Sequence, residues 1–253
     1  IKEEYSKNFI EIEDFGNLTI YNKLKKYKSK KINTFKKVID LLIQLQKIKT
    51  KEIKNFKNLK YKIPVYSKKK LLKEASLFLK WYLPKVVQQR KQKKIKYKLK
   101  SIFSKLLDKL NYKNNMFVHR DFHVSNLMYY QNNISIIDSQ DAVYGNIAYD
   151  LASLIDDVRF KTSNKEKQKM LNYYIKKNKG LEFKKFKNDF EILSVLRNLK
   201  IIGIFTRLSV RDKKNNYLKL IPYAWKLIEL RIKKNNNFYQ LKIILDQNFS
   251  KKI

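Results

Sequence analysis

The chain has 253 residues, with 59 Lys and Arg against 22 Asp and Glu, a formal net charge of +37, and no cysteine. The lack of cysteine excludes disulfides and thiolate metal sites within this sequence, and a hydrophobic content of 43% excludes a disordered chain. No apolar run approaches the ~20 residues that a membrane span needs, so we expect no membrane partner. The absence of cysteine fits the cytoplasm, and we expect a monomer.

The positive charge is carried almost entirely by lysine. Only 7 of the 59 basic residues are arginine, the residue that binds phosphate and guanine through two hydrogen bonds. Lysine accompanies abundant Asn, Ile and Tyr, with only 4 Gly and 3 Pro, which indicates a bias toward A/T-rich codons. We therefore expect no specific nucleic-acid partner.

Most of the chain has apolar residues at helical spacing, beginning after a short strand at 9–13 and a turn at 14–17. The apolar helix over 190–208 is expected to be buried on most sides. Leu83-Pro84 is expected to end or kink the helix before it. Trp81 and Tyr82 fit the core, although a pocket lining is the alternative. Predicted helices cover residues 18–26, 32–48, 68–82, 91–110, 148–158, 165–177, 190–208, 217–232 and 238–245.

The spacing changes in the middle of the chain. Residues 116–118 form a short apolar run, and two more runs, 127–130 and 134–137, are separated by a polar turn at 131–133. This pattern predicts a strand followed by a β-hairpin. Residues 49–62 and 141–146 are expected to be loops.

Residues 114–160 contain no lysine, and their six carboxylates outnumber two arginines. Within them, Asp121 follows a short strand, Asn126 begins the next strand, and Asp138 ends its hairpin partner. Because a hairpin brings its outer ends together, we expect Asn126 and Asp138 to face each other. Amide and carboxylate oxygens suit Mg²⁺, and Asp121 is free to accept a hydroxyl proton. This arrangement is suited to phosphoryl transfer.

The spacing from His119-Arg120-Asp121 to Asn126, followed by Asp138, resembles the catalytic and metal-binding loops of the protein-kinase-like fold. Asp138 is followed by Ser139-Gln140 rather than Phe-Gly, which points away from protein kinases. The motifs at 119–128, 137–145 and 148–154 instead resemble the aminoglycoside phosphotransferase and choline kinase-like family. The likeness is closest to its bacterial anomeric amino-sugar kinases, which act on N-acetylmuramate and N-acetylglucosamine. Residues 12–16, 78–84 and 197–205 resemble further segments of that family.

The resemblance implies roles for particular residues. Asp121 would be the catalytic base, and Asn126 and Asp138 would hold Mg²⁺. Asp150 would anchor the catalytic loop, and His119 would support it.

The resemblance leaves two further parts of the site less defined. Backbone groups of the hinge residues Glu13, Asp14 and Phe15 would contact the adenine of ATP. Two roles are open for the side chain of His123: a hydrogen bond within the loop, which we favour, and a contact with substrate.

The expected fold is α+β and mainly helical, namely the C-terminal lobe of a protein-kinase-like fold with a small central β-hairpin and with the N-terminal β lobe largely absent. Residues 1–17 would be the end of the N-lobe and the hinge strand. Residues 18–253 would be the helical C-lobe, with a catalytic loop at 118–126 and a metal loop at 136–146. No Gly-rich loop and no early-strand lysine is found to cover the phosphates of ATP, so the sequence is expected to be incomplete.

The expected activity is transfer of the γ-phosphate of ATP to a hydroxyl of a small molecule, most readily an amino sugar. A choline, ethanolamine or aminoglycoside kinase is the alternative, because the motifs do not identify the acceptor. A non-catalytic kinase-like lobe is a third reading. The joint presence of Asp121, Asn126 and Asp138 argues against it.

Overall fold

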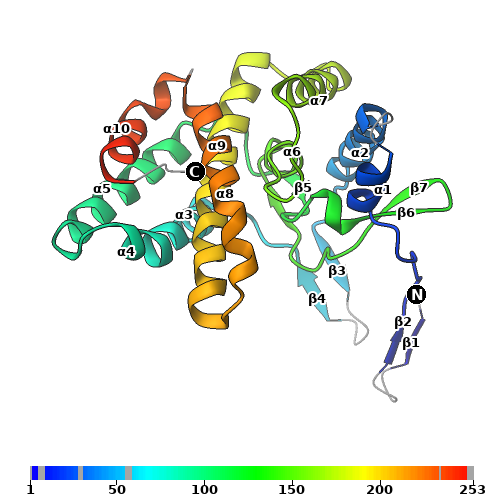
Figure 1. Ribbon diagram of the computed structural model, residues 1–253. Coiled ribbons are helices and arrows are strands. Elements are labelled where there is room, and N and C mark those ends of the chain that lie inside the picture. The colour runs from blue at the N-terminus through cyan, green and yellow to red at the C-terminus, as the bar shows by residue number, and fades with distance from the viewer. Residues whose placement is uncertain (1, 5–8, 28–30, 55–58, 234, 250–253) are drawn as a thin grey trace.

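A computed structural model of the chain describes residues 2–4, 9–27, 31–54, 59–233 and 235–249. The described part is mainly helical, as the apolar spacing predicts, and it contains four small two-stranded sheets. Figure 1 shows α8 and α9 in the middle of the molecule, with α5 and α10 on one side and α1, α2 and the β6–β7 hairpin on the other. The helices are α1 Ile20–Lys26, α2 Lys31–Gln46, α3 Lys68–Ala75, α4 Leu83–Val86, α5 Gln89–Asp108, α6 Tyr149–Ile155, α7 Asn164–Lys177, α8 Phe183–Asp212, α9 Ile221–Ile232 and α10 Tyr239–Asn248.

Helix α8 is the central element of the core. It packs against α3, α6, α9 and the segment Phe78–Tyr82, and most of its residues from Phe186 to Thr206 are buried. The predicted central burial is therefore confirmed. At Gly203, a Cβ atom would lie only 2.3 Å from the backbone of Leu77, so this helix can approach that segment closely because position 203 has no side chain.

The helix predicted over 68–82 is divided and runs further than expected. After α3, residues Phe78–Tyr82 form a π-helical turn in which the Leu83 N–H donates to the Phe78 carbonyl. The chain then continues as α4 through Pro84. Pro84 therefore does not end the helix: it lies in the first turn of α4, where proline is tolerated.

Trp81 and Tyr82 are both partly buried. Tyr82 stacks on Phe78, and its hydroxyl accepts a hydrogen bond from the Trp225 indole at 3.3 Å. The core reading is therefore confirmed for Tyr82.

The β6–β7 hairpin is confirmed. Strand β6 Leu127–Tyr130 pairs antiparallel with β7 Asn133–Ile136, and Leu127 faces Ile136. The turn is two residues long, one shorter than predicted, and both Gln131 and Asn132 have positive φ, at 47° and 64°. This backbone suits a tight hairpin turn because its twist matches that of the paired strands.

Three sheets contain strands that the sequence does not indicate. Strand β8 Val143–Gly145 lies in the predicted loop 141–146 and pairs with β5 Met116–Val118. Strands β3 Glu52–Lys54 and β4 Lys60–Lys62 pair within the predicted loop 49–62, of which residues 55–58 lie outside the described part. At the N-terminus, β1 Lys2–Glu4 pairs with β2 Phe9–Glu11, where a strand over 9–13 is predicted.

Candidate active site

The catalytic loop begins where β5 ends and is held by Asp150 at the start of α6. One Asp150 carboxylate oxygen accepts the His119 backbone N–H at 2.7 Å, and the other accepts that of Arg120 at 3.0 Å. Arg120 has a φ of 74°, a conformation that L-residues adopt only when their surroundings hold them in it. Asp150 therefore fixes the backbone just before Asp121, as the resemblance implies.

Asp150 is fully enclosed, at 1% exposure. Burial raises the pKa of Asp150 to about 7, against the opposing effect of its two backbone hydrogen bonds and of Arg197. A carboxyl group this deeply placed has no access to substrate, which agrees with an anchoring role.

Asp121, Asn126 and Asp138 lie together. The Asn126 amide nitrogen donates to the Asp121 backbone carbonyl at 3.1 Å and lies 3.3 Å from an Asp138 carboxylate oxygen. The side chain of Asp121 is half-buried and, within the part of the chain that the structure describes, forms no hydrogen bond or ion pair. Its carboxylate is thus free to take a proton from a bound hydroxyl.

The donor set at this point fits Mg²⁺. The Asn126 nitrogen is engaged by the Asp121 carbonyl, so its amide oxygen is left for a cation. Asp138 is exposed, with φ 69°, and its second oxygen accepts from Gln140 at 2.6 Å. The described residues contain no group of three or more His, Cys, Asp or Glu side chains placed to bind a metal, and Mg²⁺ bound through two protein oxygens takes its remaining ligands from water and phosphate.

His119 lies between the two loops. It is buried, and its Nε2 atom lies 3.1 Å from the carbonyl oxygen of Ile137, the residue before Asp138. Burial lowers the pKa of His119, so the neutral ring donates to that carbonyl. His119 thereby links the catalytic loop to the metal loop.

The predicted hinge lies beside the hairpin that carries the site. The Gly16 N–H donates to the Asp14 side chain at 2.7 Å, and the ring of Phe15 contacts that of Tyr130 edge-on at 5.8 Å. Leu18 accepts a backbone hydrogen bond from Tyr129 at 2.7 Å. Glu13 and Asp14 are exposed. The segment is therefore adjacent to β6, whose first residue follows Asn126.

Sequence reasoning missed the side-chain contacts of Arg120. Its guanidinium forms an ion pair with Glu74 on α3 at 2.7 Å and donates to the Asp141 carbonyl at 3.2 Å. Glu74 precedes Arg120 by 46 residues and belongs to no motif, so only its single acidic charge among the lysines of α3 could have drawn attention to it.

A cavity of about 370 Å³ lies next to these residues. Its wall combines the end of β4, one face of α3, Arg120 and the metal loop. The lining residues are Tyr61, Pro64, Tyr66, Lys70, Lys73, Glu74, Leu77, Arg120, Gln140, Asp141, Ala142 and Val143. It is large enough for a monosaccharide-sized ligand.

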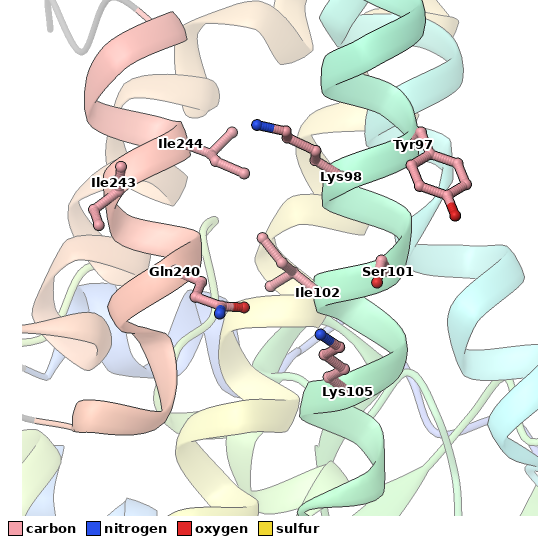
Figure 2. A pocket seen from close by; sticks show the side chains of 8 residues that line it. All are labelled: Tyr97, Lys98, Ser101, Ile102, Lys105, Gln240, Ile243 and Ile244. Carbon is pink, nitrogen blue, oxygen red and sulfur yellow. The ribbon is translucent and has the colours of Figure 1, made fainter.

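A second hollow of about 360 Å³ lies between α5 and α10, away from the catalytic loop. Figure 2 shows apolar side chains of both helices and the lysines of α5 around it. Its lining residues are Tyr97, Lys98, Ser101, Ile102, Lys105, Gln240, Ile243 and Ile244. None of the predicted site residues borders it.

No helix among the described residues has the length and apolar character to span a membrane.

His123 gives the fold a specific dependence on pH. The ring is 6% exposed, and burial lowers its pKa to about 4, whereas an unfolded histidine titrates near 6.5. Because the folded pKa is lower than the unfolded one, the folded state loses stability as pH falls from about 6.5 to about 4. Above the unfolded pKa the full contribution is present, and the free energy of unfolding lost over this range is about 3 kcal/mol. Urea denaturation of His123→Gln should show a flatter pH dependence than wild type across this range. Equal slopes would contradict the buried neutral state.

Comparisons with known proteins find similar phosphotransferases. A profile of the phosphotransferase enzyme family (APH) matches residues 27–183. The N-acetylmuramate/N-acetylglucosamine kinase of Neisseria meningitidis serogroup B is 30% identical over 222 residues, which cover 85% of this chain and 64% of that protein. The protein of the same name from Pseudomonas aeruginosa is 27% identical over 247 residues, covering 95% of this chain and 70% of that protein. The chain thus spans about two thirds of the length of these relatives.

The fold is also found among solved structures. Plasmodium vivax ethanolamine kinase matches with a TM-score of 0.59 and 12% identity, over 89% of this chain and 66% of that one, which supports a shared fold alone. The profile match includes the catalytic loop, the metal loop and Asp150, and it confirms the resemblance that the motifs indicate. The chain belongs to the phosphotransferase enzyme family.

Proposed function

We propose that this chain carries the catalytic and metal loops of an ATP-dependent kinase that phosphorylates a hydroxyl of an amino sugar. The observation that carries the proposal is the position of Asn126, whose amide contacts both the Asp121 backbone and the Asp138 carboxylate. The names of the N. meningitidis and P. aeruginosa relatives support an acceptor such as N-acetylmuramate or N-acetylglucosamine.

In the proposed reaction, Asp121 orients the acceptor hydroxyl and takes its proton as the oxygen attacks the γ-phosphorus of ATP. The bond to the β,γ-bridging oxygen breaks, and ADP leaves. Asn126 and Asp138 would hold Mg²⁺, which neutralises charge on the phosphate oxygens when it is bound. His119 and Asp150 would keep Asp121 and Asp138 at a fixed separation. This matters because positioning supplies most of the catalysis in phosphoryl transfer.

The nucleotide base is proposed to lie at the hinge. Backbone groups of residues 13–15 would contact adenine, since this segment lies beside β6 and so beside Asn126. In this reading residues 1–17 are the end of the N-lobe with the hinge, and residues 18–253 are the helical C-lobe. The protein is proposed to act in the cytoplasm as a monomer.

The acceptor is proposed to occupy the cavity between α3 and the metal loop. Tyr61 offers aromatic surface to a sugar ring, and Lys70 and Lys73 add two cations. Glu74 is already paired with Arg120 and Lys200, so it has little charge to offer choline or ethanolamine. These contacts favour a neutral or acidic sugar over an amino alcohol.

Metal binding gives a specific prediction. Asp138→Asn in the full-length protein should raise the Mg²⁺ concentration needed for half-maximal turnover about 10- to 100-fold, because one of two protein oxygens loses its charge. Asp40→Asn, on α2, removes a carboxylate that accepts from Tyr173 of α7 and should leave the Mg²⁺ requirement unchanged. Equal Mg²⁺ titrations for Asp138→Asn and wild type would remove Asp138 from the metal site.

The acceptor assignment is tested by ADP release from the full-length protein with a panel of acceptors. N-acetylmuramate and N-acetylglucosamine should support turnover, and choline, ethanolamine and kanamycin should not. Turnover with an amino alcohol or an aminoglycoside alone would overturn the amino-sugar assignment while leaving the phosphotransferase reading intact.

A further inference from the structure

Arg120 is the residue through which the catalytic loop contacts the rest of the cavity wall. Its backbone is held in a left-handed conformation by Asp150, and its side chain is about one-fifth exposed. The guanidinium lies over the ring of Tyr66, 5.3 Å from its centroid. Because Asp121 follows directly, a change in the backbone of Arg120 also moves the proposed base.

The guanidinium also reaches the metal loop. It donates to the Asp141 carbonyl at 3.2 Å and lies 3.4 Å from the Asp141 carboxylate. Asp141 is three residues beyond Asp138 in sequence. One side chain therefore bridges the loop of the proposed base and the loop of the proposed metal ligand.

Glu74 fixes this guanidinium from outside both loops. One carboxylate oxygen accepts from Arg120 at 2.7 Å, and the other contacts Lys200 of α8 at 2.5 Å and the hydroxyl of Tyr66. The side chain is 19% exposed. Burial opposes ionisation, but Lys200, Tyr66 and Arg120 outweigh it and hold the pKa of Glu74 below its usual value. The carboxylate is thus charged and engaged at both oxygens.

Packed helices surround Glu74. Helix α3 packs against α5 and α8, its first turn is capped by Ser67, and Lys200 lies on the buried central helix. Tyr66 donates its hydroxyl to Glu74 and lies 3.1 Å from the Tyr149 hydroxyl, next to Asp150. Because packed helices hold Glu74, its ion pair fixes the position of the Arg120 guanidinium.

We propose that Glu74 is a positioning residue for phosphoryl transfer, which holds Arg120 and through it sets Asp121 against the metal loop. This inference rests on the proposed kinase function. Glu74 lines the proposed acceptor cavity but touches no reacting atom, so its loss should lower the rate of the chemical step more than it weakens substrate binding.

The kinetic test uses Glu74→Gln in the full-length protein, because glutamine keeps the shape and removes the charge. We expect kcat to fall about 10- to 100-fold, as for a displacement of about 1 Å at the reacting groups, with KM for ATP changed less than about threefold and KM for the acceptor raised by a smaller factor than kcat falls. The matched control is Asp108→Asn, which removes an ion pair of α3 that does not involve Glu74, Lys68–Asp108 at 2.6 Å, and should retain wild-type kcat. An unchanged kcat in Glu74→Gln, or a raised acceptor KM with unchanged kcat, would overturn the proposal.

A double-mutant cycle with Arg120→Gln tests whether Glu74 acts through Arg120. If it does, the double variant should be no slower than the slower single variant. If kcat of the double variant falls by the product of the two single-variant factors, Glu74 acts independently of Arg120, and the proposal is overturned.

Hydrogen exchange separates this inference from the function on which it rests. In Glu74→Gln, peptides covering residues 118–123 and 139–145 should exchange faster than in wild type, and those of α10 should not. If wild type transfers no phosphate but these loops loosen, the kinase proposal fails and the structural coupling stands. If wild type is active and neither exchange nor kcat changes in the variant, the positioning role alone is refuted.

Discussion

Asp121→Asn is expected to lower kcat for phosphate transfer about 10²- to 10⁴-fold, the range that a positioned general base contributes. Asparagine has the same shape but cannot accept the hydroxyl proton. The Asp121 backbone carbonyl still accepts from Asn126, so the loop should keep its conformation. ADP release with a saturating amino-sugar acceptor measures the loss, and isothermal titration calorimetry should find ATP·Mg²⁺ affinity within about threefold of wild type.

Two results would separate the possible failures of this assignment. Unchanged turnover in Asp121→Asn would exclude Asp121 as the base. A joint loss of turnover and of nucleotide affinity would indicate that the substitution disturbs the metal site, which Asp138→Asn should reproduce. Asp40→Asn serves again as the control with wild-type turnover.

Asp156→Ala is expected to lower the free energy of unfolding by about 3 to 5 kcal/mol, the cost of leaving buried charges without their partner. Asp156 has 0% exposure. Its two oxygens accept from Arg231 at 2.8 and 2.9 Å, and Lys167 lies 3.2 Å away. Burial would raise the pKa of Asp156, but Arg231 and Lys167 overcome it and lower the pKa to about 2. Alanine would therefore leave two cations in the core.

Urea denaturation monitored by circular dichroism measures the effect. Asp108→Asn, which breaks an exposed ion pair, should change the free energy of unfolding by less than about 1 kcal/mol. Adding Arg231→Met to Asp156→Ala should recover part of the loss, because it removes one unpaired cation. A loss below about 1 kcal/mol in Asp156→Ala would show that the buried cluster contributes little.

The sequence predicts the helices because their apolar residues repeat at helical spacing over many turns. Helix α8 differs, because its apolar run leaves almost no face for solvent; the sequence therefore predicts its buried middle, 190–208, but not its ends at Phe183 and Asp212. The three-residue strands β3, β4 and β8 carry no such repeat. They are strands because a partner segment lies beside them, as when Tyr144 pairs with Phe117, and such pairing depends on tertiary structure.

Some residues of the candidate site could likewise be predicted from the sequence, and others depend on tertiary packing. Asp121, Asn126 and Asp138 could be predicted because one hairpin of adjacent sequence brings them together. Glu74 and Lys200 could not, because they reach Arg120 only after α3 and α8 have packed against each other. The ion cluster of Asp156 likewise joins residues from α7, α8 and α9.

³¹P NMR of the full-length protein with ATP, Mg²⁺ and N-acetylmuramate follows the proposed phosphoryl transfer directly. We expect a sugar-phosphate resonance that grows in step with ADP and is absent with Asp121→Asn. Conversion of ATP to ADP and inorganic phosphate alone, or no turnover with any hydroxyl acceptor, would contradict it.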